Sequence, residues 1–130
     1  MAERLFVYGT LRRDVEHPEH ARLARIATFE APARVRGRLY VVDWYPGLVL
    51  DARAGPVTGE LWRLQTDADL TALDAYEGCA PDDPTPHEYV RTIIGAQRTD
   101  TREEVPAWAY LYAGVTAALP VVASGDWRDR

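Results

Sequence analysis

The sequence of 130 residues contains no lysine, so its 15 basic side chains other than histidine are all arginine. A Schiff base and a phosphate-binding P-loop both need the amine of a lysine, and both are therefore excluded. Serine is almost as rare, because Ser124 is the only one, and it lies outside any Gly-x-Ser-x-Gly motif. A serine-hydrolase triad is therefore not expected.

Histidine and cysteine, the usual ligands of zinc, are few and scattered. Cys79 is the only cysteine, so no disulfide can form within the chain. His17, His20 and His87 have no metal-binding spacing with one another or with Cys79, and no metal site is expected. We interpret Cys79 as a small buried side chain, because no partner that would lower its pKa is evident. Carboxylates, tyrosines, threonines and backbone amides remain as groups for chemistry.

Long apolar runs and a surplus of positive charge are also missing. No run approaches the roughly 18 residues of a membrane span, and the first residues lead into a predicted strand instead of a secretory signal. With one cysteine, this predicts a cytoplasmic protein. A net charge of −5 with interspersed arginines disfavours nucleic-acid binding. We interpret residues 1–130 as a single domain.

Apolar patterning predicts about six strands and two helices. Strands are expected at 4–9, 33–42, 48–51, 57–64, 87–97 and 103–114, and helices at 17–26 and 67–77. The continuous apolar run at 4–9 is typical of a buried central strand. Alternation in the second strand places Arg34, Arg36 and Arg38 on an exposed face. These patterns favour an α+β domain built on a largely antiparallel sheet or small barrel.

Several residues mark the ends of these elements. The segment "WYPG" (44–47) predicts a turn that contains Pro46 and Gly47, and Gly78 predicts the end of the second helix. Thr66 and Asp69 have the spacing of a capping box at its start. Pro106 suggests that the last strand lies at an edge or begins with a bulge.

The segment "LDAYEG" (73–78) places a carboxylate at the end of a predicted helix. Successive residues of a helix are rotated by about 100° around its axis, so Glu77 lies about 20° from Leu70. Glu77 therefore shares the apolar face of the helix, on which Leu70 and Leu73 are expected to be buried. Burial and the negative end of the helix dipole both oppose ionisation, which would raise the pKa toward a range useful to a general base or acid. The alternative is a glutamate whose stem covers the core while its carboxylate reaches water.

The segment "VYGTLRR" (7–13) is the second candidate. Gly9 permits a sharp turn after the first strand, where backbone N–H groups could converge on a carboxylate or an oxyanion. The alternative is an ordinary turn after a core strand, with Arg12 and Arg13 simply solvated. We expect a pocket where this turn meets the end of the 67–77 helix.

The motifs "YGTL", "YPGLV", "GELW" and "LDAYEGC", followed by Tyr89 and Arg91, resemble the γ-glutamylcyclotransferase-like superfamily. They look most like its γ-glutamylamine cyclotransferase and AIG2-like branch, and the resemblance covers roughly residues 4–112. It implies a small mixed, largely antiparallel β-barrel with flanking short helices.

The resemblance also implies a cofactor-independent reaction on a small γ-glutamyl substrate. The α-amino group attacks the γ-carbonyl and the ring closes to 5-oxoproline, which releases an amine or amino acid. Glu77 would act as general base and acid, because the attacking amine, with a pKa of roughly 8, must lose a proton and the leaving amine must gain one. The backbone amides of Tyr8, Gly9, Thr10 and Leu11 would hold the α-carboxylate. Two further residues would line the pocket or pack in the core: Tyr89 and Tyr112.

Two alternatives stay open. The same fold can serve as a non-catalytic small-molecule-binding or regulatory module. The chemistry can also belong to a pathway-specific enzyme that removes γ-glutamyl groups from a larger acceptor. The leaving amine, the oligomeric state and a lid role for the loop at 82–86 are not defined by the sequence.

Overall fold

The computed structural model of the chain describes residues 3–13, 18–65 and 69–129. Its elements are β1 (Arg4–Val7), α1 (Pro18–Ala24), β2 (Ala27–Val41), β3 (Pro46–Leu50), β4 (Pro56–Leu64), α2 (Asp69–Tyr76), β5 (Tyr89–Arg98), β6 (Glu104–Tyr112) and the short 3-10 helix η1 (Trp127–Asp129). The predicted α+β class is confirmed, and most predicted ends are within a few residues. His17 and the cap residue Thr66 lie outside the described residues.

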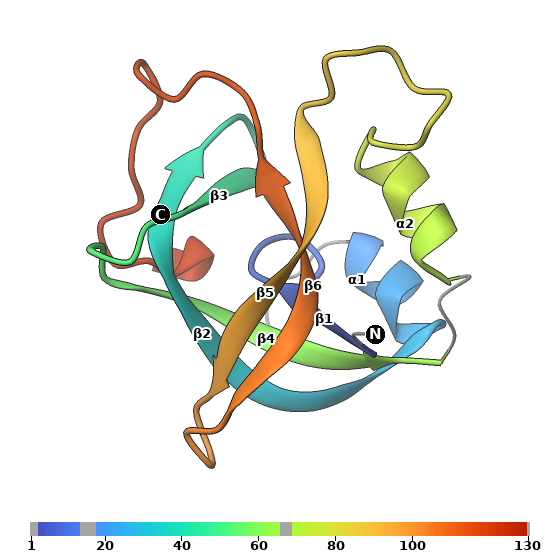
Figure 1. Cartoon of the computed structure of the whole chain (residues 1–130), viewed down its shortest axis with the longest axis vertical. Helices are drawn as coiled ribbons and strands as arrows, with labels where there is room; N and C mark the ends of the chain where they lie inside the picture. The colour runs from blue at the N-terminus through green and yellow to red at the C-terminus, as the bar shows by residue number, and fades with distance from the viewer. Residues whose placement is uncertain (1–2, 14–17, 66–68, 130) are drawn as a thin grey trace.

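The six strands form a mixed barrel. Hydrogen bonds join them in the order β1-β4-β2-β3-β6-β5, and a further pairing of β1 with β6 closes a ring of five strands. Only the β1–β6 and β3–β6 contacts are parallel among the described pairings, so the predicted largely antiparallel barrel is confirmed. Figure 1 shows both helices on one side of the barrel, with α2 beside the upper ends of β5 and β6.

Strand β1 is buried on both faces, as its continuous apolar run predicts. Phe6 belongs to the cluster inside the barrel, together with Tyr8, which directly follows the strand. Leu5 and Val7 belong to a second cluster, which includes Leu73 of α2. β1 therefore lies between two cores, and the chain leaving it enters a region walled by both.

Strand β2 shows the predicted alternation. Arg34, Arg36 and Arg38 are exposed, whereas the intervening side chains are buried. Arg38 pairs with Asp51 at 3.3 Å across the β2–β3 hairpin, and Arg34 donates to Gln97 of β5 at 3.3 Å. The arginines therefore lie on the outer surface of the barrel.

The predicted turn at 44–47 is right for Trp44 and Tyr45 but wrong for Pro46 and Gly47. Both residues belong to β3, where Pro46 pairs with Val41 and Gly47 with Tyr40. The chain turns one step earlier, at residues 43–45. A glycine is needed at position 47 for a packing reason, because a Cβ there would lie 2.7 Å from the Cβ of Tyr112.

The residues after 114 carry no pattern from which an element could be predicted, yet they pack on the barrel. The N–H of Val122 donates to the Leu39 carbonyl at 2.7 Å, and that of Val41 to the Pro120 carbonyl at 2.8 Å. Trp127 of η1 is fully buried in the barrel cluster. In the described part of the chain, neither helix has the length and apolarity needed to cross a membrane.

Candidate active site

The end of α2 fixes the position of Glu77. Gly78 adopts a φ of +72°, which is a left-handed conformation that favours glycine. The N–H of Cys79 donates back to the Asp74 carbonyl at 2.9 Å, which completes a common helix-ending motif. The predicted end of the helix at Gly78 is confirmed, and Glu77 is the residue immediately before the change in direction.

Asp74 fastens α2 to the barrel. Its carboxylate accepts two hydrogen bonds from Arg91 of β5, at 2.8 and 3.2 Å, and one from the Tyr110 hydroxyl at 2.8 Å. The Arg91 guanidinium lies 4.3 Å from the centre of the Trp108 ring. These contacts tie the last turn of α2 to β5 and β6, and they set where Glu77 is placed.

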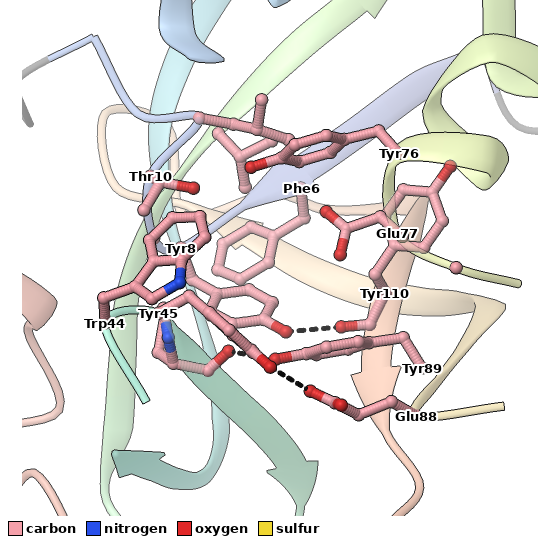
Figure 2. A pocket seen from close by; sticks show the side chains of 15 residues that line it. Phe6, Tyr8, Thr10, Trp44, Tyr45, Tyr76, Glu77, Glu88, Tyr89 and Tyr110 are labelled. Atoms are coloured by element: carbon pink, nitrogen blue, oxygen red, sulfur yellow. Dashed lines mark hydrogen bonds between the residues drawn. The ribbon is translucent and has the colours of Figure 1, made fainter. Parts of the chain in front are cut away.

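A cavity of about 380 Å³ lies where the end of α2 meets the chain that leaves β1. Its described lining is Phe6, Val7, Tyr8, Gly9, Thr10, Leu11, Trp44, Tyr45, Pro46, Tyr76, Glu77, Gly78, Glu88, Tyr89 and Tyr110. Glu77 is half-buried, and Figure 2 shows its carboxylate pointing into the cavity. A pocket therefore lies at the predicted place, and it brings Glu77 together with the segment 8–11.

Gly9 gives this segment its shape through packing. A Cβ at this position would lie 2.6 Å from Cγ of Pro46, closer than two such atoms can approach. Gly78 and Gly125 are the described glycines with positive φ, so Gly9 is not needed for an unusual backbone angle. The tight turn that follows is closed by a bond from the Arg12 N–H to the Gly9 carbonyl at 3.0 Å.

The far side of the turn is braced by two carboxylates. The Arg12 side chain is only 2% exposed and bonds to Asp126 of the C-terminal segment at 2.9 Å, so the alternative of a solvated Arg12 is wrong. Arg13 is about half exposed, and its N–H donates to Glu60 of β4 at 2.9 Å. The pocket segment is therefore held from β4 and from the end of the chain.

Three tyrosines, here called the pocket tyrosines, form one wall of the cavity: Tyr8, Tyr89 and Tyr110. The hydroxyl of Tyr8 donates to the Tyr110 carbonyl, and that of Tyr89 to the Pro46 carbonyl at 2.6 Å (Figure 2). Burial is the largest cause that raises the pKa of each phenol above its usual value, and the charge of Glu77 adds to it. They are therefore neutral hydrogen-bond donors near neutral pH.

The structure departs from the predicted site at Tyr112, whereas Cys79 is close to its prediction as a small side chain with no partner that lowers its pKa. Tyr112 is not part of the described lining and instead packs edge-on against Tyr89, with ring centres 5.6 Å apart. Cys79 is partly buried, and burial, followed by the charges of Asp74 and Glu77, raises the pKa of its thiol to about 11. A reactive thiolate is therefore not favoured.

Sequence reasoning missed several lining residues, above all Trp44, Tyr45, Tyr76 and Glu88. Tyr45 is the first residue of the "YPGLV" motif, Trp44 precedes it and Glu88 precedes Tyr89, but only the fold shows that they face one cavity. No three His, Cys, Asp or Glu side chains in the described ranges come together in a group able to hold a metal ion.

The fold is a small mixed barrel, and its candidate site places a half-buried carboxylate opposite the segment that follows the first strand. Fold and site together correspond to one class of protein. The model of the family "Gamma-glutamyl cyclotransferase, AIG2-like" matches residues 5–129, and this chain belongs to that family. The predicted superfamily is therefore confirmed.

Relatives agree with this assignment. The chain is 32% identical over 130 residues to "Gamma-glutamylcyclotransferase family protein YtfP" of Escherichia coli, covering 98% of this chain and 97% of the relative. The solution structure of Escherichia coli ytfP has a TM-score of 0.67 at 32% identity, with 98% of this chain and 99% of that chain covered. The crystal structure of a mouse AIG2-like protein has a TM-score of 0.74 at 25% identity, covering 93% of this chain and 86% of that chain.

Proposed function

We propose that this protein is a γ-glutamylcyclotransferase that converts a small γ-glutamyl amide into 5-oxoproline and a free amine without a cofactor. One observation carries the proposal: Glu77 points into a cavity whose opposite lining is the segment from Tyr8 to Leu11 (Figure 2). Family membership supports the same class of reaction. A small γ-glutamyl partner rather than nucleic acid or a membrane, and a cytoplasmic location, remain predictions.

In this mechanism the carboxylate of Glu77 takes a proton from the substrate's α-amino group. The nitrogen attacks the γ-carbonyl carbon, a ring C–N bond forms, and the C–N bond to the leaving amine breaks. Glu77 returns the proton to the leaving nitrogen, so no water is consumed. The pocket tyrosines support this assignment. Their raised pKa values keep them protonated, which leaves the carboxylates of Glu77 and Glu88 as the groups of the described lining that can accept a proton.

Binding of the α-carboxylate falls to the backbone amides of residues 8–11 in this proposal. A held carboxylate folds the short glutamyl chain back on itself, which converts the attack into a well-oriented intramolecular step. The neutral hydroxyl of Thr10 and the buried neighbours of the segment would add positioning.

The test is the variant Glu77→Gln, which keeps the shape of the side chain but cannot carry the proton. Release of 5-oxoproline from γ-glutamyl alkylamides should fall by at least about 10² to 10⁴, the usual contribution of a general acid–base. Thermal unfolding should be unchanged or slightly higher, because burial and the helix dipole both oppose a charge there. The control is Glu104→Gln, which changes the same charge at an exposed position at the start of β6.

Retained activity in Glu77→Gln would refute the assignment of the base. Lost activity together with marked destabilisation would instead make Glu77 a structural partner. If the wild-type protein binds γ-glutamyl compounds but releases no 5-oxoproline, the non-catalytic binding module is the correct function.

A further inference from the structure

The turn after β1 offers two backbone donors to a ligand. The bond from the Arg12 N–H to the Gly9 carbonyl closes this turn, with Thr10 and Leu11 at its two central positions. The N–H groups of the central residues take no part in closing such a turn. Among the described residues they donate to no backbone carbonyl, although Thr10 and Leu11 are both buried. A ligand in the cavity can therefore use them.

The orientation of these donors matters because the described lining of the cavity has no basic side chain. Its charged side chains are Glu77 and Glu88, and the whole chain lacks lysine. A flexible arginine or lysine can follow an anion by rotating its side-chain bonds, whereas a backbone N–H points where its planar peptide unit points. Binding of a carboxylate at residues 8–11 therefore depends on how firmly these peptide units are held.

Three side chains behind the turn form what we call the Trp62 cluster: His20 of α1, and Glu60 and Trp62 of β4. The His20 ring meets the Trp62 ring edge-on with centres 5.4 Å apart, and Nε1 of Trp62 donates to Oε1 of Glu60 at 3.1 Å. Glu60 and Trp62 are both 5% exposed. None of the three belongs to the described lining of the cavity. The cluster is therefore a fixed support outside the cavity.

The Trp62 cluster binds the backbone of the turn at two adjacent points. Nδ1 of His20 donates to the Leu11 carbonyl at 3.1 Å, because a carbonyl oxygen can only accept. Oε1 of Glu60 accepts the Arg13 N–H at 2.9 Å. The peptide unit between Leu11 and Arg12 is thus held on both sides, by His20 at its C=O and by the Gly9 carbonyl at its N–H. Rotation of this unit would break both bonds.

We propose that His20 and Glu60 are positioning residues for the α-carboxylate of a γ-glutamyl substrate, a role that rests on the proposed function. They act through the backbone of the turn, whose N–H groups they hold toward the cavity, and they touch no substrate atom themselves. A loosened turn should bind the α-carboxylate less well but leave proton transfer by Glu77 in place. KM should therefore rise by a larger factor than kcat falls.

Two variants of His20 separate the hydrogen bond from the packing. His20→Asn keeps a side-chain N–H donor, whereas His20→Phe keeps a ring against Trp62 and removes the donor. His20 is partly exposed, so folding is not at risk. We expect KM for the γ-glutamyl amide of n-butylamine to rise about tenfold in His20→Phe, the scale of one hydrogen bond to a charged group. In His20→Asn, KM should stay within about threefold of the wild type.

Glu60 is tested in the same way. Glu60→Gln keeps an oxygen that accepts from Arg13 and Trp62, whereas Glu60→Leu leaves two buried donors without an acceptor. KM should stay near the wild-type value in the first variant and rise about tenfold in the second. Because Glu60→Leu also destabilises the protein, the control is Val105→Ala. Val105 is buried in the barrel cluster away from the described lining, so this variant should lower Tm without changing KM.

Two inhibitors show whether the α-carboxylate is the group affected. 5-Oxoproline and 5-oxoprolinamide share a ring and differ only in the group that the turn would bind. In His20→Phe the inhibition constant of 5-oxoproline should rise together with KM. The inhibition constant of the amide should stay unchanged, because it has no carboxylate to lose contact with the N–H groups.

Each outcome is decisive. An unchanged KM in an active His20→Phe overturns the inference while leaving the proposed function intact. A KM that rises equally in His20→Asn and His20→Phe overturns the role of the bond to Leu11, and an equal rise of both inhibition constants overturns the role of the α-carboxylate. If the wild-type protein releases no 5-oxoproline, the proposed function fails and this inference fails with it.

Discussion

Replacing Gly9 with alanine tests the packing on which the pocket depends. The added methyl would lie 2.6 Å from Cγ and 2.8 Å from Cδ of Pro46. Ordinary contacts of such atoms begin at 3.4 Å, so the segment that follows β1 and the start of β3 must separate by about 0.8 Å. The proline ring cannot rotate away as a flexible side chain would, because it is closed on its own backbone.

Overpacking of this kind costs about 1–3 kcal/mol. In a chain of 130 residues each kcal/mol lowers Tm by roughly 3–5 °C, so Gly9→Ala should melt several degrees below the wild type. The effect should also reach the pocket wall, because the carbonyl of Pro46 accepts the hydroxyl of Tyr89 at 2.6 Å. We therefore expect Gly9→Ala to raise KM for γ-glutamyl amides as well as to lower the stability of the protein.

The matched control is Gly55→Ala. Gly55 is exposed, has no positive φ, and no described atom would lie within 4 Å of its new methyl group. Alanine there should be neutral or stabilise by about 0.4–1 kcal/mol, because it restricts the unfolded chain. Urea unfolding of both variants measures the difference, and equal stability of Gly9→Ala and Gly55→Ala would show that the contact with Pro46 is not the reason for the glycine.

Two further predictions concern neighbours of Glu77. Asp74→Asn weakens the paired hydrogen bonds from Arg91, so we expect the free energy of unfolding to fall by about 1–3 kcal/mol. This is less than for a fully buried ion pair, because both side chains are partly exposed. We also expect kcat to fall, because α2 is less firmly placed. Chemical denaturation and 5-oxoproline release measure both, and an unchanged kcat would contradict the positioning role. The Cys79 thiol, with a pKa raised to about 11 from 9.0, stays protonated as pH rises through the range in which a free thiol ionises. Its alkylation by iodoacetamide at pH 8 should therefore be roughly a hundredfold slower than that of a free thiol, and a midpoint near pH 9 would contradict the assigned environment.

The parts of the fold that follow from local patterns could be predicted. The apolar run of β1, the alternation in β2 and the glycine after α2 each report a periodic or steric requirement within a few residues. Pro46 and Gly47 were wrongly predicted to lie in a turn, because proline and glycine usually mark turns. Here Gly47 is part of β3 and makes room for the Tyr112 side chain. Close approach between distant strands leaves no local pattern.

The same distinction applies to the site. Glu77 and the segment 8–11 could be proposed together because a motif in each resembles the same superfamily. The bond between Tyr45 and Glu88 at the pocket and the bond between Arg12 and Asp126 both join residues far apart in the chain, and in the second case 114 positions separate the partners. The sequence around Arg12 offers no sign of Asp126, so two adjacent arginines look equally solvated.

The bond between Arg12 and Asp126 has a consequence for biosynthesis. β1 and the pocket segment are synthesised well before the carboxylate that braces them, because 114 positions separate Arg12 from Asp126. During translation β1 must wait for β4 and β6 to pair with it, and the pocket segment must wait for Asp126. Such a topology has few local contacts to guide early folding, so the nascent chain completes its pocket only after Asp126 has been synthesised.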